Sequence, residues 1–303
     1  MRVCSLLPSA TEMLFAMGAG DDVVGVTFEC DYPAQARERP HVVSSHMPEG
    51  LPPAEIDTLV KMTGAEGKSL YFADFDLLER LEPELVVLQD LCHVCAIDSP
   101  TLARDLSRLP SRPRVVSLNA SSLEGIFREI EMLGEATGHR EGSRKVAAEL
   151  RARVERVRES VPKSKPRPKV LCLEWLDPPF QGGHWVPEMV EIAGAEAVLA
   201  SPAEKSVQIT WQQIVDSQPD IVVIMPCGYH LKETVEQFRE IERSFPAEWK
   251  ELAAVQNGRV YAVDGSAYFS RPGPRVVDGL EILRALVSGA EWDHLPPDSV
   301  AQL

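Results

Sequence analysis

The sequence has no apolar stretch of about 18 residues, the length that a membrane-spanning helix needs, so we expect nothing in it to span a membrane. It is also poor in positive charge: 31 Lys and Arg stand against 46 Asp and Glu, a formal net charge of −15. Binding to nucleic acid requires clustered Lys and Arg at the phosphates. The charge balance therefore argues against a nucleic-acid partner.

A disulfide framework and a phosphate loop are missing too. The six cysteines lack the dense spacing of a disulfide-stapled domain, and a chain of 303 residues does not need such staples. Cys4 and Cys172 lie inside apolar runs, which predicts buried free thiols. Neither GxxxxGK followed by Ser or Thr nor GxGxxG occurs, so nothing indicates a nucleotide site.

The N-terminus "MRVCSLLPSATEM" leads directly into a strand pattern and a helix pattern. It leaves no room for the charged region, apolar core and cleavage site of a signal peptide. We therefore expect a cytoplasmic protein. The alternative is a periplasmic or other extracytoplasmic protein whose leader was removed.

Short β-branched runs alternate with helical patterns along the whole chain. "RVCSLLP", "VVGVT" and "LVVLQ" occur in the first half, and "KVLCLEW" and "DIVVI" in the second. Strands that are apolar on both faces and alternate with helices are typical of a parallel sheet covered on both sides. The pattern predicts an α/β fold of two Rossmann-like lobes with mainly parallel sheets, residues 1–139 and 166–303. In the first lobe, Ser9 and Glu12 predict a capping box at the start of a helix, and Gly18 predicts its end.

Residues 140–165 separate the two lobes and contain one narrow apolar stripe at helical spacing. A helix from Glu141 to Val161 would be roughly 30 Å long at 1.5 Å per residue. An ordinary surface helix is the alternative. The position midway between two similar halves favours one long bridging α-helix that joins the lobes. The stripe consists of Val146, Leu150, Val154, Val157 and Val161.

The two halves also share a local pattern. "LLERLEPELVVL" and "WQQIVDSQPDIVVI" both run from an amphipathic helix through Pro and an acidic residue into a buried strand. This is a weak internal repeat of architecture.

Ligands of open parallel sheets bind outside the carboxyl ends of the strands. The loops expected there are rich in sulfur, imidazole and aromatic groups, and clefts between domains are preferred sites for small molecules. We therefore expect these loops to line a cleft between the lobes. They contain Cys30, Cys92, Cys95, Cys227, His46, His93, His184, His230, Phe180, Trp185, Tyr229, Tyr268 and Phe269.

Four segments, in their order along the chain, resemble a known family. They are "RVCSLLPSATEMLFAMGAGDDVVGVTFECDYP", "EWLDPPFQGGHWVPEMVEIAGAE", "ITWQQIVDSQPDIVVI" and "SAYFSRPGPR". Together they resemble the cobalamin-binding periplasmic proteins of ABC importers, which belong to the helical-backbone class of metal-chelate binding proteins. The resemblance covers nearly the whole chain. It implies two α/β lobes joined by one rigid helix, a small-molecule ligand between them and an ABC permease as partner.

The resemblance also implies ligand contacts by position. These fall on Pro8, Ser9, Glu29, His46, Gln89 and the loop after it with Cys92 and His93, on Phe180 through Trp185 including His184, and on Tyr268, Phe269 and Arg271. Glu29 and His46 stand where the family carries aromatic rings, and "CHVCA" replaces a glycine-rich stretch. Glu, His and Cys are potential metal ligands, so one of them could coordinate cobalt.

Three interpretations of Cys92-His93-Val94-Cys95 remain open. A zinc site needs four ligands, and the two cysteines of this motif supply two; Cys30, His46 or His93 could complete the set, although the sequence has no second CxxC. A redox pair should open a helix, whereas Ser99-Pro100 places the expected helix start after the pair. The third interpretation, which we favour, is a loop that faces the ligand. The metal-ligand candidates are His46, His93, Cys92 and Cys95.

The sequence thus predicts a monomeric binding protein that captures a corrinoid or a related metal macrocycle, either for ABC-type import or as a carrier or sensor. It predicts no catalytic residues and no required cofactor. His46 or His93 is the candidate ligand to the metal, and zinc at the Cys92–Cys95 loop stays a possibility. The alternatives are a siderophore, haem or metal-ion binding protein, or a metal- or thiol-dependent enzyme that uses Cys92, Cys95 and a histidine.

Overall fold

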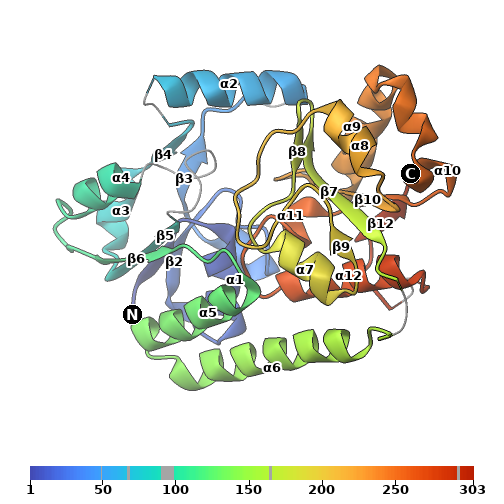
Figure 1. Ribbon diagram of the computed structural model, residues 1–303. Coiled ribbons are helices and arrows are strands. Elements are labelled where there is room, and N and C mark those ends of the chain that lie inside the picture. The colour runs from blue at the N-terminus through green and yellow to red at the C-terminus, as the bar shows by residue number, and fades with distance from the viewer. Residues whose placement is uncertain (49, 67–68, 90–98, 164–165, 292–293) are drawn as a thin grey trace. The chain divides into compact units, whose positions relative to one another are not determined.

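The computed structural model describes residues 1–48, 50–66, 69–89, 99–163, 166–291 and 294–303. Figure 1 follows the chain in colour from its N-terminus to its C-terminus. The chain divides into two compact units, each built on a six-stranded sheet. Unit 1 comprises Met1–Ala120 and Gly125–Glu149, and unit 2 comprises Ser121–Glu124 and Leu150–Leu303. The predicted α/β class with two Rossmann-like lobes is confirmed.

Unit 1 has the strand order β4-β3-β2-β1-β5-β6. All neighbouring pairs are parallel except β3 and β4. The strands are β1 (Val3–Ser5), β2 (Val23–Thr27), β3 (His41–Ser45), β4 (Tyr71–Ala73), β5 (Leu85–Gln89) and β6 (Arg114–Leu118). The helices are α1 (Pro8–Ala16), η1 (Gly20–Asp22), η2 (Ala34–Glu38), α2 (Pro53–Ala65), α3 (Phe75–Leu81), α4 (Ser99–Leu106) and α5 (Leu123–Thr137), the last beginning in unit 2.

The central position of β1 decides which face of this sheet each helix covers. The chain moves from β1 toward β2 through α1, and from β5 toward β6 in the opposite direction through α4. Right-handed crossovers in opposite directions place their helices on opposite faces. On the face that α4 covers, Leu102 and Leu106 pack with Leu78 of α3 and with Val86 and Leu88 of β5.

Unit 2 has the strand order β12-β11-β10-β7-β8, and β9 pairs with the beginning of β7. The pairs among β7, β9, β10 and β11 are parallel, while β8 and β12 run antiparallel to their neighbours. The strands are β7 (Lys169–Leu176), β8 (Pro179–Gln181), β9 (Glu196–Ala197), β10 (Ile221–Ile224), β11 (Val260–Val263) and β12 (Val300–Gln302). The helices are α7 (Val186–Ile192), α8 (Trp211–Ser217), α9 (Leu231–Ile241), η3 (Glu242–Ser244), η4 (Ala247–Glu251), α10 (Ala253–Gln256), α11 (Gly265–Tyr268) and α12 (Val276–Ser288).

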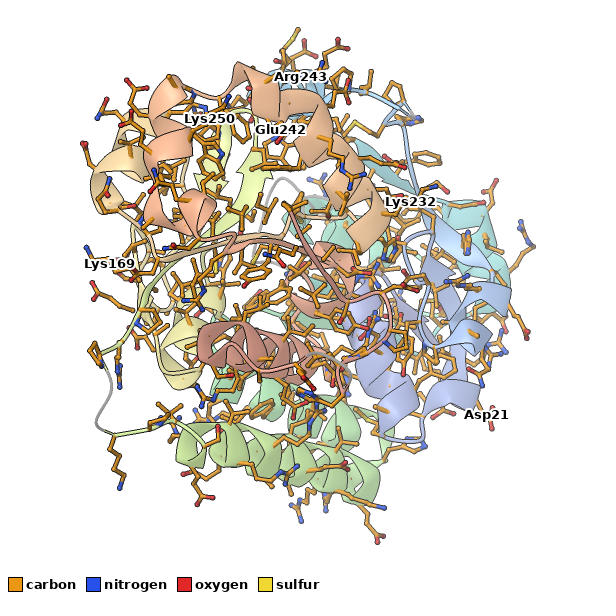
Figure 2. All side chains as sticks on the ribbon, turned by 90° about the vertical axis from the view of Figure 1, so that its right-hand side faces the viewer. Asp21, Lys169, Lys232, Glu242, Arg243 and Lys250 are labelled. Atoms are coloured by element: carbon orange, nitrogen blue, oxygen red, sulfur yellow. The ribbon has the colours of Figure 1, made fainter. Side chains whose placement is uncertain are left out.

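The surface of unit 2 around α9 mixes both signs of charge. Lys232, Glu242, Arg243 and Lys250 point outward from α9 and the turns after it (Figure 2). Within η4, Trp249 is buried and packs edge-on against Trp211 and Phe245. The same short segment therefore supplies both a charged surface and part of the core of the unit.

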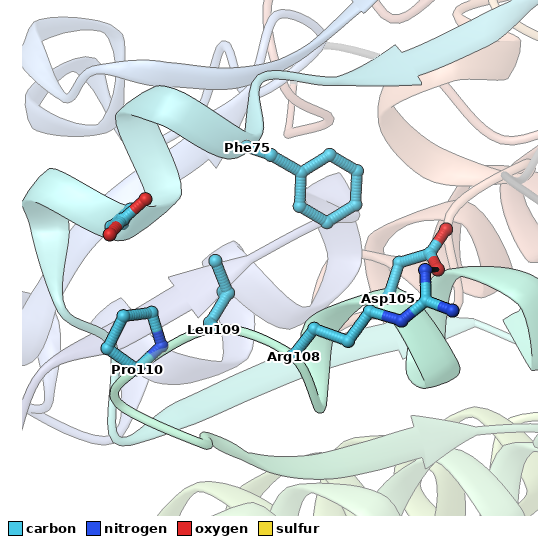
Figure 3. A pocket seen from close by; sticks show the side chains of 6 residues that line it. Phe75, Asp105, Arg108, Leu109 and Pro110 are labelled. Carbon is cyan, nitrogen blue, oxygen red and sulfur yellow. Dashed lines mark hydrogen bonds and ion pairs between the residues drawn. The ribbon is translucent and has the colours of Figure 1, made fainter.

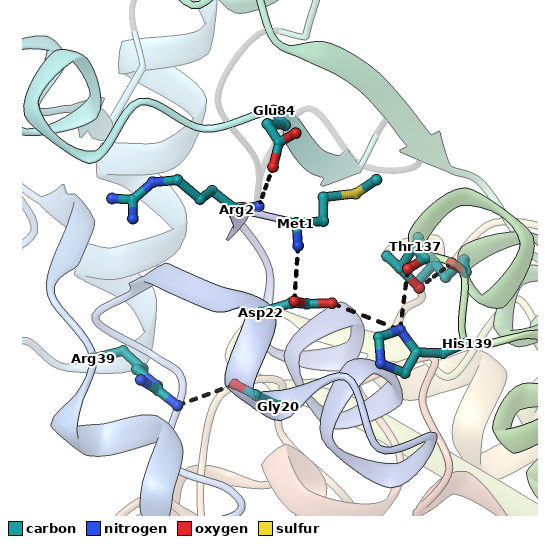
Figure 4. Close-up of polar contacts among 9 residues, drawn as sticks. Met1, Arg2, Gly20, Asp22, Arg39, Glu84, Thr137 and His139 are labelled. Atoms are coloured by element: carbon teal, nitrogen blue, oxygen red, sulfur yellow. Dashed lines mark hydrogen bonds and ion pairs between the residues drawn. The ribbon is translucent and has the colours of Figure 1, made fainter.

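The weak internal repeat predicted from the sequence has a structural counterpart. Helices α3 and α8 both end at a left-handed residue, Glu82 with φ 44° and Gln218 with φ 46°, directly before a proline. The acidic residue after each proline accepts a hydrogen bond from the backbone at the beginning of the central strand. In unit 1 the backbone N–H of Arg2, directly before β1, donates to Glu84 at 2.8 Å (Figure 4). In unit 2 the backbone N–H of Lys169, the first residue of β7, donates to Asp220 at 2.8 Å.

The predicted capping box at the first helix is wrong. The cap of α1 is Leu7, and no side chain caps the helix. Pro8 takes the first helical position, where its missing N–H costs nothing. Ser9 therefore lies inside the helix and is 2% exposed. The predicted stop is confirmed, since Gly18 follows the helix with φ +88°.

Helix α6 (Arg140–Glu159) corresponds to the predicted long helix and contains the position, between Glu149 and Leu150, at which the chain passes from unit 1 to unit 2. The predicted stripe is largely buried, with Leu150, Val154 and Val157 at most 8% exposed. In unit 2, Arg153 binds Glu281 through two hydrogen bonds of 2.6 and 3.0 Å. The assignment of residues 140–165 to a separate bridging segment stays a prediction.

Candidate functional site

The switch point of the sheet in unit 1 lies between β1 and β5, where the crossovers diverge in opposite directions. In open α/β sheets the crevice for a ligand forms outside the carboxyl ends of the strands at such a point. The predicted residues Pro8 and Ser9 follow β1, and Gln89 ends β5. The structure therefore places three of the predicted residues at one edge. Pro8 and Gln89 are half-buried.

A buried polar cluster lies beneath this edge. The Thr11 hydroxyl donates to the Ser5 hydroxyl at 2.8 Å and lies 3.1 Å from Sγ of Cys30. Ser5 and Thr11 are fully buried, and Cys30 is 2% exposed. These contacts hold the first turn of α1 against the ends of β1 and β2, and they place the Cys30 thiol inside the unit.

The neighbouring strands β2, β3 and β4 carry aromatic rings at the same edge. Phe28 directly follows β2, is 40% exposed and stacks on Tyr71 with ring centroids 6.3 Å apart. His46 directly follows β3 and stacks on Phe72, with centroids 4.3 Å apart and an interplanar angle of 20°. The predicted residue Glu29 lies next to Phe28 and is half-buried. The sequence reasoning did not single out Phe28 and Phe72, which carry aromatic rings at this edge next to Glu29 and His46.

In unit 2 the chain leaves β7 toward β8 and β9 on one side and continues through β10 and β11 on the other, so the switch point lies between β7 and β10. Trp175 near the end of β7 and Tyr229 after β10 pack edge-to-face, with centroids 5.6 Å apart. The backbone N–H of Cys227 donates to the Glu174 carbonyl at 3.1 Å. Sequence reasoning placed Tyr229 in this region but did not single out Trp175.

The loops after β10 and β11 are tied together by a His–Asp pair. Nδ1 of His230 lies 2.9 Å from Oδ2 of Asp264. Asp264 also caps α11, because its Oδ1 accepts from the backbone N–H of Ala267 at 2.7 Å. The backbone N–H of His230 donates to Glu233 at 2.8 Å at the start of α9. The backbone around His230 is therefore held in place on two sides.

The predicted segment from Phe180 to Trp185 turns sharply after β8. His184 has φ +56°, and the backbone of Glu204 accepts its N–H at 2.6 Å. A side chain at Gly183 would meet the backbone of Ser206 at 2.3 Å, so only glycine fits there. The His184 imidazole is half-buried, and burial, together with the charge of Lys205, lowers its pKa.

Trp185 and Phe269 lie inside unit 2. They are 4% and 2% exposed, and the indole N–H of Trp185 donates to the Phe269 carbonyl at 2.9 Å. Phe180, Tyr268 and Arg271 are half-buried. The ligand contacts predicted for these residues stay predictions. The two buried rings connect the turn after β8 to the loop after β11.

The Cys92–Cys95 loop, with His93, lies outside the described residues. Among the residues that the structure describes, no group of three or more His, Cys, Asp and Glu is placed to hold a metal ion. Cys4 and Cys172 are buried free thiols as predicted, and burial raises the pKa of each to about 12. Cys227 is free and exposed.

One hollow in unit 1 lies away from the predicted residues. It has a volume of about 420 Å³ and is lined by Phe75, Glu79, Asp105, Arg108, Leu109 and Pro110 (Figure 3). An ion pair of 2.9 Å between Arg108 and Asp105 stands at its rim. None of the predicted site residues lines this hollow, so the candidate site is the carboxyl edge of each sheet.

No described helix has the length and apolarity to cross a membrane.

Comparisons with known proteins identify the family of this chain. The family of periplasmic binding proteins matches residues 3–267. The uncharacterized ABC transporter substrate-binding lipoprotein YvrC of Bacillus subtilis is 25% identical over 288 residues, 93% of this chain and 78% of the relative. A vitamin B12-binding protein of Vibrio cholerae is 24% identical over 282 residues, 92% of this chain and 86% of the relative.

Solved structures show the same fold. A periplasmic heme-binding protein from Pseudomonas aeruginosa superimposes with a TM-score of 0.71 at 19% identity, covering 96% of this chain and 94% of its own. The family match confirms the resemblance drawn from the sequence. It also confirms that the protein is a binding protein and not an enzyme.

The expectation of a cytoplasmic protein is wrong. The matching family is described as periplasmic, and one relative is a lipoprotein. The expectation rested on the first residues of the sequence, which form β1 and α1. Residues that build the fold carry no information about export, so they could not support that expectation.

Proposed function

This chain belongs to the periplasmic binding protein family, and from that premise we propose that it captures a corrinoid for import through an ABC transporter permease. The vitamin B12-binding and ABC transporter relatives, which align with more than nine-tenths of the chain, support both the ligand class and the permease partner. Haem is the competing ligand, because structural neighbours bind it.

The observation that carries the proposal is the presence of aromatic rings at the carboxyl edge of each sheet. Phe28 and Phe72 stand at this edge in unit 1, and Trp175 with Tyr229 in unit 2. A corrin ring is planar and offers broad apolar faces. Burial of such faces contributes about 25 cal/mol per Å², and aromatic contact adds about 1 kcal/mol for each ring pair.

The first test is to titrate the purified protein separately with aquocobalamin, aquocobinamide and hemin, followed by calorimetry and absorbance. Saturable binding of the two corrinoids, tighter than that of hemin, is the expected result. Tight binding of hemin alone would replace the corrinoid by haem. Absence of binding to all three would remove metal macrocycles from consideration.

Variants at Trp175 test whether the edge of unit 2 takes part. Trp175→Ala should weaken corrinoid binding about tenfold, which corresponds to about 1.4 kcal/mol. Trp175→Phe keeps an aromatic ring and should stay close to the wild type. Equal affinities of both variants and the wild type would exclude Trp175 from the site, provided that circular dichroism shows all three to be folded.

A further inference from the structure

Phe72 and His46 lie on the same face at the edge of the sheet in unit 1. In the antiparallel pair of β3 and β4, Phe72 is directly opposite Ser44. Opposite residues in antiparallel strands point to the same face, and His46 is two residues beyond Ser44, so it shares that face. The backbone N–H of His46 donates to the Leu70 carbonyl at 2.8 Å, which extends the ladder past the end of β3.

The contact between the two rings is a face-to-face stack. Their centroids are 4.3 Å apart and their planes differ by 20°. Such a stack covers one face of the imidazole and restricts its rotation, but it leaves the two nitrogens at the ring edge. Within the described part of the chain, neither imidazole nitrogen of His46 has a hydrogen-bond partner. Imidazole binds metals through the lone pair of a ring nitrogen, which lies in the plane of the ring.

Both rings are accessible from solvent at the edge where a ligand is expected. Phe72 is 41% exposed, which is unusual for a phenylalanine within a strand, and His46 is exposed as well. His46 follows the carboxyl end of β3, while His41 begins this strand. His41 and His46 therefore lie at opposite edges of the sheet.

We propose that Phe72 is a positioning residue for His46, and that it holds the imidazole so that a ring nitrogen meets the metal at the centre of the ligand. This inference rests on the proposed function and deepens it. His46 supplies the coordinating atom, and Phe72 sets the plane of the ring. A planar metal macrocycle with an exchangeable axial position is the ligand chemistry that this pair recognises.

The test uses aquocobinamide, a corrinoid without its own nucleotide base, as the probe. Replacement of cobalt-bound water by imidazole shifts the absorption bands, so the wild type should show a shifted spectrum at saturation. His46→Ala should bind at least tenfold more weakly and show the unshifted spectrum. Added free imidazole should restore the shift in this variant. His41→Ala is the matched control and should behave as the wild type.

Variants of Phe72 separate positioning from mere stability. At saturation, Phe72→Ala should give a mixture of shifted and unshifted spectra together with weaker binding. Phe72→Tyr keeps the stack and should restore the wild-type spectrum. A purely structural role of Phe72 would weaken binding and leave the spectrum at saturation unchanged, and that result would overturn the positioning role.

The outcomes distinguish this inference from the proposed function. A wild type that binds corrinoids with no band shift, or a His46→Ala variant with the wild-type spectrum, overturns the inference and leaves the proposed function standing. A wild type that binds none of the three macrocycles overturns both. Circular dichroism and urea unfolding of each variant show whether a loss of binding reflects a loss of folding.

Discussion

Glu129 is a partly buried carboxylate in α5 that holds the chain as it leaves β6. One of its oxygens accepts the backbone N–H groups of Asn119 and Ala120, at 2.5 and 2.8 Å. Its other oxygen is buried and has no hydrogen-bond partner among the described residues. Burial raises the pKa of Glu129 above its ordinary value of 4.5, and the two backbone hydrogen bonds offset only part of this effect.

This pKa shift predicts a pH dependence of stability. Between pH 4.5 and the raised pKa, the folded protein binds more protons at Glu129 than the unfolded chain does. The contribution of Glu129 to the free energy of unfolding therefore falls as the pH rises through that interval. Glu129→Gln removes the titration and keeps an oxygen acceptor for the two N–H groups. Urea unfolding from pH 4.5 to 7.5 measures the free energy of unfolding of both proteins. As the pH rises, the value for the variant should increase relative to that of the wild type.

Glu135 on the same helix provides the control. It is exposed, and its hydrogen bond to Arg140 lowers its pKa. Its contribution to stability is lost as the pH falls below about 4.5, outside the interval tested. Glu135→Gln should therefore leave the pH dependence above 4.5 unchanged. Parallel wild-type and Glu129→Gln curves would show that Glu129 does not titrate in this interval.

Two helical glycines have opposite surroundings and predict opposite effects of a methyl group. Gly142 in α6 lies so close to the end of α1 that a Cβ would be 2.0 Å from the Met17 carbonyl oxygen. Gly64 in α2 has nothing within 4 Å of such an atom. Each change to Ala gains helix propensity, at most about 1 kcal/mol. Only the change at Gly142 also forces a backbone contact apart.

Gly142→Ala should therefore lower the free energy of unfolding, by about 1–3 kcal/mol as for other overpacked sites. Gly64→Ala should raise it by about 0.5–1 kcal/mol, because exposed helical glycine costs that much relative to Ala. The urea midpoints of the two variants and the wild type measure both effects. If both variants were stabilised equally, α6 would not pack on Met17 as described.

For the whole molecule, the distribution of tryptophan offers a probe of one unit alone. All five tryptophans of the sequence lie at Trp175 or beyond, and the four that the structure describes belong to unit 2. Tryptophan fluorescence thus reports the unfolding of unit 2, whereas far-ultraviolet circular dichroism reports both units. A ligand that binds only the folded state, at 100 times its Kd, adds about 2.7 kcal/mol to the free energy of unfolding.

Because we propose that the edges of both sheets bind the corrinoid, saturating aquocobalamin should raise the unfolding midpoint measured by each probe. A rise in the fluorescence midpoint with part of the circular dichroism transition unchanged would show that the ligand stabilises unit 2 alone. Thermal melts with and without ligand, recorded with both probes on one sample, make this comparison.

The sequence by itself determined the elements and their order. Strands follow from apolar β-branched runs, and helices follow from apolar stripes at helical spacing. The internal repeat follows from the shared pattern around Pro83 and Pro219. These are local patterns, so both α/β units and the repeat were predictable. Parallel strands all end at the same edge of their sheet. The alternation of strands and helices therefore already implied that Pro8, Ser9, His46 and Gln89 lie at the carboxyl edge. The family resemblance followed from the same residues in the same order.

Only the tertiary structure decided which side chains reach the surface of that edge. Trp185 and Phe269 are as aromatic as Trp175 and Phe72 in the sequence, yet they are buried while Phe72 is exposed. The His46–Phe72 stack joins β3 to β4 across 26 residues of sequence, and its register depends on the antiparallel pairing. Burial and pairing of this kind result from packing between distant segments, and no local pattern encodes them.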